Sequence, residues 1–169
     1  MGYVHDTAMS QYIPPTAFHP VTGTFTWTAG QVAGTIAMHR AAANETSVIN
    51  VPIMLPSNSV ALKGAYLQSV EFDYECLIGV ATSITATMNK VTRGVDGAVA
   101  VVASVPVTQD LTAGTDAADV DQHKLTVTVT TPVWIDNDVY YLLVITIVAG
   151  AGGQTNDFLG AVANYTLRL

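Results

Sequence analysis

The chain has 169 residues, of which half are apolar and only 11% are charged, and its net charge is −7. This length fits one domain with a core of its own, but the charged fraction is well below the average of about 25% for soluble domains. The six basic residues are scattered from Arg40 to Arg168, which argues against a nucleic-acid surface and against binding to an anionic membrane. Either Thr, Ser, Asn and Gln solvate the surface, or other subunits cover part of it, because interface cores are depleted of charge.

The first 21 residues predict an extended N-terminal arm. Pro14, Pro15 and Pro20 disfavour helix and favour extended backbone. The arm nevertheless carries more large apolar side chains than a disordered tail would hold. A sandwich of eight strands has little room to bury a further segment, so we expect the arm to contact a neighbouring subunit. The expected interface residues are Tyr3, Val4, Tyr12, Ile13 and Phe18.

Short segments with period-2 alternation follow the arm and predict up to nine strands. They cover residues 24–28, 32–40, 46–55, 66–78, 84–89, 98–108, 125–130, 139–148 and 158–169. Turn and loop signals separate them, including 94–97, 109–121, 136–138 and the glycine-rich 149–157. No segment has a convincing helical period.

The segment 66–78 has the clearest pattern. Val70, Phe72, Tyr74 and Cys76 share one side of the expected strand, and we predict that this side faces the core. Cys76 is the only cysteine, so an intramolecular disulfide is excluded and a buried thiol is expected. Glu71, Asp73 and Glu75 share the other side. They predict a solvated face, a cation site, or pairing with a Lys or Arg of a neighbour.

Two further strands carry positional information. Pro52 predicts that the strand 46–55 lies at a sheet edge or contains a bulge, because proline lacks a backbone donor. Residues 139–148 are apolar on both sides, which predicts a central strand or a strand at an interface.

Many short strands with Gly, Pro and Asn turns predict an all-β fold, a single sandwich over residues 22–169. A jelly roll of eight to nine antiparallel strands is favoured over an immunoglobulin-like topology, whose Cys–Trp–Cys spacing is absent.

Candidate chemical sites are few. Asp119 and Asp121, with His123, alternate just before a strand and form a weak candidate for calcium, against the alternative of a solvated acidic loop. The four histidines are far apart in sequence, and no triad order, metal-binding or phosphate-binding motif is present. We therefore expect no enzyme activity, no cofactor and no tightly bound transition metal. Trp27 is expected in the core, and Trp134 is the better candidate for stacking on a sugar.

No basic segment followed by an apolar run marks a signal peptide, and the longest apolar run, 139–150, is too short to span a bilayer as a helix.

Several stretches resemble the small jelly-roll structural proteins of virus particles, in particular the head decoration (cement) proteins of tailed bacteriophages. They are Tyr3-Val4-His5-Asp6 with Ile13-Pro14-Pro15, Leu55-Pro56-Ser57-Asn58-Ser59 leading into Lys63-Gly64-Ala65-Tyr66, and residues 159–167. The resemblance implies a homotrimer on the outer surface of a capsid, bound to the major capsid protein lattice and stabilising it. It implies no catalytic residues.

Three functions of different classes remain open. The first is a virion decoration protein. The second is a subunit of another extracellular tube or filament. The third is a sugar-binding module on a tail or a cell surface.

Overall fold

The computed structural model describes residues 6–30, 34–57, 64–79, 81–94, 98, 100–110, 120–150 and 153–168. These residues form twelve strands and one 3-10 turn, and no α-helix occurs among them. The elements are β1 (Asp6–Ile13), η1 (Pro15–Ala17), β2 (His19–Thr22), β3 (Phe25–Ala29), β4 (Ile36–Ala43), β5 (Thr46–Ile53), β6 (Ala65–Ile78), β7 (Ala81–Thr92), β8 (Val101–Val105), β9 (Val107–Gln109), β10 (Gln122–Trp134), β11 (Val139–Ala149) and β12 (Gln154–Arg168).

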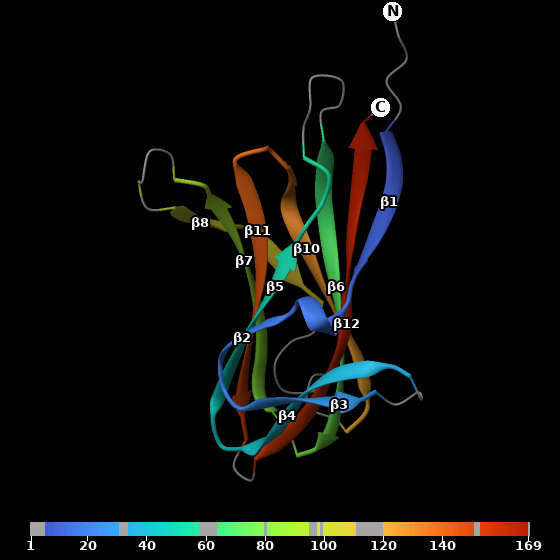
Figure 1. The fold of residues 1–169 in the computed structure, drawn as a ribbon, viewed down its shortest axis with the longest axis vertical. Helices are drawn as coiled ribbons and strands as arrows, with labels where there is room; N and C mark the ends of the chain where they lie inside the picture. The colour runs from blue at the N-terminus through green and yellow to red at the C-terminus, as the bar shows by residue number, and fades with distance from the viewer. Residues whose placement is uncertain are drawn as a thin grey trace, which may run out of the picture.

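The strands form two antiparallel sheets that pack face to face (Figure 1). The larger sheet has the order β3-β4-β12-β6-β10-β9, with β1 added along β12, and the smaller has the order β2-β5-β11-β7-β8. From β4 to β7, each strand passes to the opposite sheet, and β10, β11 and β12 return in the same way. This winding sets β4-β12-β6-β10 against β5-β11-β7-β8, which is the jelly-roll arrangement of two Greek keys. The all-β sandwich and its predicted jelly-roll topology are therefore confirmed.

The core lies between the two sheets and follows the predicted alternation. Val70, Phe72, Tyr74 and Cys76 of β6 are fully or almost fully buried, so the inward side of this strand is confirmed. The Phe72 ring lies 5.7 Å from that of Phe18 and 5.8 Å from that of Phe158, measured between ring centroids. These aromatic side chains fill the space between the sheets where β6 and β12 run side by side.

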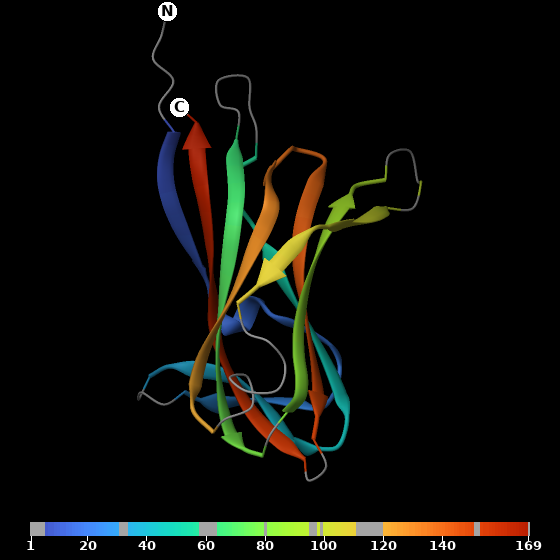
Figure 2. The ribbon, with the colours of Figure 1, turned by 180° about the vertical axis from the view of Figure 1, so that it is seen from behind.

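The segment 98–108, expected as one strand, is broken at Pro106. The residues before it form β8, which pairs with β7 in the smaller sheet, while those after it form β9, which pairs with β10 in the larger sheet. Proline has no backbone donor to continue the ladder, so it suits a crossing between sheets. Figure 2 shows β8 projecting from the body of the sandwich. Val101, Ala103 and Val105 would share one side of a single regular strand, but the first two are exposed and only Val105 is buried.

The N-terminal segment is extended as expected, but it belongs to the sandwich. β1 pairs with the second half of β12, from Asp6 opposite Arg168 to Ile13 opposite Ala161 (Figure 1). Ile13 is 5% exposed and Phe18 is 3% exposed within their own chain, so neither is available to a neighbour. The boundary at residue 21 therefore does not separate an arm from a domain.

β1 can join the sheet because β12 extends beyond the residues that pair with β4. β4 pairs only with Gln154–Phe158, which leaves the edge of the remaining half open to β1. Tyr3 and Val4 lie outside the described residues, and Tyr12, 57% exposed, is the one described residue of the expected interface that lies on the surface.

The positional predictions for two other strands are confirmed. β5 lies between β2 and β11, but β2 pairs with it only from Val48 to Asn50, so the edge of β5 at Pro52 is open. β11 is the central strand of the smaller sheet, paired with β5 and β7. Within the described residues, no helix has the length and hydrophobicity needed to cross a membrane.

Candidate ligand-binding groove

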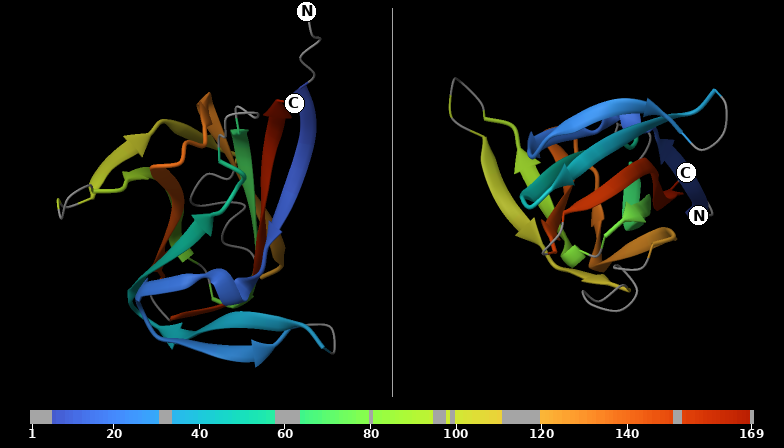
Figure 3. Two further views of the ribbon diagram at one scale, coloured as in Figure 1. Left: turned by 45° about the horizontal axis from the view of Figure 1, so that its top comes forward. Right: turned by 90° about the horizontal axis from the view of Figure 1, so that it is seen from below.

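Two adjoining hollows lie on the outer side of the larger sheet. One has a volume of about 490 Å³ and the other about 400 Å³, and both are lined by Tyr12, Gln122 and Leu159. The first also reaches η1 and, where the chain enters β4, the residues Gly34, Thr35 and Ile36, while the second reaches Asp73 and Lys124. We call the two hollows together the groove. The hairpin of β3 and β4, which lies across one end of the sandwich, forms part of one wall (Figure 3).

Tyr12 forms a fixed aromatic surface at the centre of the groove. Its hydroxyl donates a hydrogen bond of 2.8 Å to the backbone oxygen of Leu159. Its ring packs on Gly160, where φ is +150° and where a Cβ would lie only 2.5 Å from the tyrosine oxygen. Burial, and then the nearby Asp73 carboxylate, raise the pKa of Tyr12, so the hydroxyl remains a donor at neutral pH. More than half of the residue's surface still faces solvent.

A β-bulge places Leu159 in the groove. Phe158 is opposite Tyr74 and Gly160 is opposite Asp73, so Leu159 is the extra residue in the ladder between β12 and β6. A bulge of this kind turns one side chain away from the regular alternation. Phe158 is fully buried, while Leu159 is partly exposed and contributes an apolar wall beside the Tyr12 ring.

Polar side chains of β6 and β10 form the opposite wall. Asp73 and Lys124 are paired across these two strands, and Lys124 Nζ lies 3.2 Å from Glu71 Oε2. Burial and then the Glu71 carboxylate raise the pKa of Asp73, and the Lys124 ammonium opposes this shift. The groove therefore offers a carboxylate, an ammonium group and the amide of Gln122 next to an aromatic ring.

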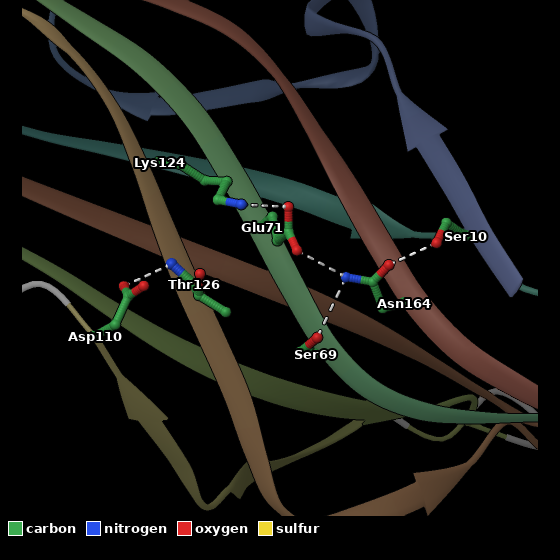
Figure 4. A network of polar contacts seen from close by, with 7 residues as sticks. All are labelled: Ser10, Ser69, Glu71, Asp110, Lys124, Thr126 and Asn164. Atoms are coloured by element: carbon green, nitrogen blue, oxygen red, sulfur yellow. Dashed lines mark hydrogen bonds and ion pairs between the residues drawn. The ribbon is translucent and has the colours of Figure 1, made fainter. Parts of the chain in front are cut away.

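A continuous set of contacts holds this face across four strands (Figure 4). Ser10 of β1 donates to Asn164 Oδ1 of β12 at 2.6 Å, and Asn164 Nδ2 donates to Ser69 Oγ and to Glu71 Oε1 at 3.4 and 3.2 Å. Glu71 then contacts Lys124 of β10. For Glu71, the predicted partner cation therefore comes from the same chain and not from a neighbour. Through the contact with Glu71, the network holds the Lys124 ammonium of the polar wall.

The calcium candidate is not assembled in the described residues. Asp119 lies outside them. Asp121 is exposed, and its Oδ1 accepts a hydrogen bond of 2.7 Å from the backbone nitrogen of Gln122, which is a local contact at the start of β10. The ring of His123 lies against that of Tyr74 at 5.2 Å. No group of three or more His, Cys, Asp or Glu suited to a metal ion occurs in the described part of the chain.

Trp27 does not lie where it was expected, and the partly buried Trp134 already has an aromatic neighbour. Trp27, expected in the core, is 53% exposed, because β3 is an edge strand. Trp134, expected to be open for stacking on a sugar, already lies against Tyr66, with ring centroids 4.4 Å apart. Neither lines the groove. Among the residues that do, Gln122, Lys124 and Leu159 had no signal in the sequence pattern that marked them as a site.

Comparisons with known proteins found similarity only among solved structures. No protein-family model matches the chain, and no curated protein matches it. A structure described as carbohydrate-binding modules of the β-sandwich superfamily has a TM-score of 0.47 and 12% identity. The match covers 95% of this chain and 56% of the chain in that structure. A Clostridium thermocellum xylanase 10B fragment with modules CBM22-1 and GH10, complexed with xylohexaose, has a TM-score of 0.46 and 9% identity, covering 90% of this chain and 27% of its own. A CBM28 module specific for non-crystalline cellulose has a TM-score of 0.40 and 14% identity, covering 94% and 84%.

The chain thus spans about half and about a quarter of the lengths of the first two of these structures. Likeness at these scores does not indicate what this chain binds. The capsid role, the lattice partner and the virion location remain predictions. The jelly-roll fold that the resemblance implied rests on the strand order itself.

Proposed function

We propose that the chain is a non-catalytic module that binds a carbohydrate chain in the groove on its larger sheet. The observation that carries this proposal is the Tyr12 ring, which is held by Gly160 and the Leu159 carbonyl while much of its surface is open to solvent. This function is the third of the three that the sequence left open. The proposed site consists of other residues than Trp134, which the sequence suggested for stacking on a sugar.

The chemistry of the groove suits a sugar. A pyranose ring has an apolar face of C–H groups surrounded by hydroxyls, so it needs an apolar platform with donors and acceptors at its edge. Tyr12 and Leu159 supply the platform, and Asp73, Gln122 and Lys124 supply acceptors and donors. Ligand sites commonly combine an apolar lining with a few placed polar groups in about 300–1,000 Å³, and each hollow lies within that range.

Binding without hydrolysis fits the state of the carboxylates. A glycosidase needs two carboxyl groups in different environments, one of them acting as a general acid and the other as a base or nucleophile. Glu71 is engaged by Lys124 and Asn164, which leaves Asp73 as the acidic group facing the groove. A single acceptor of this kind orients hydroxyls and does not complete a catalytic pair.

The test is a glycan array followed by calorimetry with the best ligand. Tyr12→Ala removes the platform, and Gly160→Ala displaces it because a Cβ there meets the ring. Each variant should weaken binding about tenfold or more, equivalent to about 1.4 kcal/mol. Trp27→Ala is the matched control, since it removes an exposed aromatic ring outside the groove. The proposal fails if no glycan binds, or if Trp27→Ala weakens binding while folded Tyr12→Ala does not.

A further inference from the structure

The outer side of the smaller sheet lacks charge along its central strands. In the register of β5, β11 and β7, the outward-facing rows place Pro52, Leu142 and Asn89 together, then Asn50, Val144 and Thr87, then Val48, Thr146 and Thr85. We call these nine residues the neutral face. None of them is charged, whereas the outer side of the larger sheet carries Glu71, Asp73 and Lys124.

β11 makes this face more apolar than a solvated sheet requires. Its inward residues Tyr141, Leu143 and Ile145 are buried in the core, which accounts for one side of the strand. Antiparallel sheets with one face in water normally alternate apolar inward and polar outward residues. Here Leu142 and Val144 face outward and are only partly buried, so the core does not account for the apolar outer side.

A hollow of about 440 Å³ lies at one end of the neutral face. Pro52, Leu142 and Tyr140 line it, together with Met54, which is 70% exposed. Methionine is flexible and adapts to irregular apolar surfaces. An exposed methionine beside an apolar hollow provides both a projection and a recess on the same surface.

We propose that the neutral face is the interface with a second copy of this chain, packed back to back about a two-fold axis. Two copies of a chain with a net charge of −7 repel each other, so they approach most favourably where neither presents a charge. A two-fold interface must also be complementary to itself. Uncharged rows of Thr, Val and Leu meet that condition, and the exposed Met54 and the hollow give each copy a projection and a recess on the same surface.

The available area fits a stable pair. The five strands of the smaller sheet are between four and twelve residues long. At about 4.8 Å between strands and about 3.4 Å rise per residue, the whole outer side of this sheet, with the neutral face as its central part, presents roughly 650 Å² per copy, near the roughly 800 Å² per partner of standard interfaces. The groove lies on the outer side of the other sheet, so both grooves of the pair remain accessible. The pairing does not depend on the proposed ligand and is tested without it.

The test is sedimentation equilibrium of the full chain from low to high micromolar concentration. The wild-type chain should reach the mass of two copies. Thr87→Glu places a charge in the middle row of the neutral face, where the second copy would bury it, and should weaken association at least tenfold. Thr128→Glu is the matched control, an exposed threonine in β10 on the outer side of the larger sheet, and it should associate like wild type.

Met54→Asp supplies a second probe outside the strands, and circular dichroism checks that each variant is folded. A wild-type chain that stays monomeric at high micromolar concentration overturns the proposal. A mass of three copies also overturns it, because a trimer cannot form by two-fold packing alone. Folded Thr87→Glu and Met54→Asp variants that both associate like Thr128→Glu place the interface elsewhere.

Discussion

Phe72→Ala tests whether the core of the sandwich lies where the structure places it. The Phe72 side chain is fully buried, and its ring contacts those of Phe18, Tyr74 and Phe158 with centroids 5.7, 5.9 and 5.8 Å away. Returning such a side chain to water costs about 1.5–3 kcal/mol, and the cavity left behind adds to that cost. β12 and β10 flank β6 through backbone hydrogen bonds, so the strand cannot move to fill the space.

We therefore expect a loss of about 3–5 kcal/mol in the free energy of unfolding, which is a large share of the roughly 5–15 kcal/mol typical of a domain. For a chain of this size, Tm should fall by about 6–20 °C. Equilibrium urea unfolding followed by tryptophan fluorescence measures the change. Trp27→Ala deletes an aromatic ring at the surface instead, and it should cost about 1 kcal/mol or less. Equal costs for the two variants would refute this placement of the core.

Two further predictions concern the groove and the opposite end of β6. The pKa of Asp73 is raised in the folded chain, so the native state holds this proton more tightly, and stability is lost as pH rises from the ordinary value of 3.8 through the folded pKa. Asp73→Asn should therefore be more stable than wild type at pH 7 in urea unfolding, and this advantage should disappear below pH 3.8. An unchanged advantage at low pH would contradict the raised pKa of Asp73. Cys76 is buried and accepts hydrogen bonds from Asn156 Nδ2 and Gln154 Nε2, so a thiol reagent should label it only after unfolding, and rapid labelling of the native chain would show that it is accessible.

The strand 66–78 was predictable because one local rule decides it. Val70, Phe72 and Tyr74 alternate with Glu71 and Asp73, and burying the charged side would have been far more costly than burying the apolar one. β6 is also central in its sheet, so its neighbours did not alter that pattern. The jelly roll was likewise accessible, since each of its eight strands, β4 to β8 and β10 to β12, overlaps a segment predicted from its alternation.

The N-terminal segment was harder to predict because its partner is distant in sequence. Pro14 and Pro15 interrupt it, and nothing local shows that β12 has an open edge from Ala161 onward. Pro106 divides a regular alternation into β8 and β9 for a similar reason, since the pattern does not indicate which sheet each half joins. The number of strands therefore depends on pairing between distant segments, which the local pattern does not show.

The groove depends on register more than on composition. Leu159 enters it through a bulge, and Tyr12 reaches Gly160 only because β1 lies along β12. A glycine within a strand is the one sequence feature that could have indicated a close approach there. Arg40 shows the same limit in the core. Its buried guanidinium donates to Ser47 Oγ and to the backbone oxygen of Glu45, which are near in sequence, but also to the backbone oxygen of Gln154, which is 114 residues away.

The most direct measurement of the central claim is a map of where a carbohydrate binds. Amide chemical shifts of the isotopically labelled chain can be followed during titration with the strongest glycan from the array. The account predicts that the largest changes cluster at Tyr12, Gly160 and Lys124, on the outer side of the larger sheet. Changes centred on the neutral face or around Trp27, or a spectrum unaffected by any glycan, would contradict it.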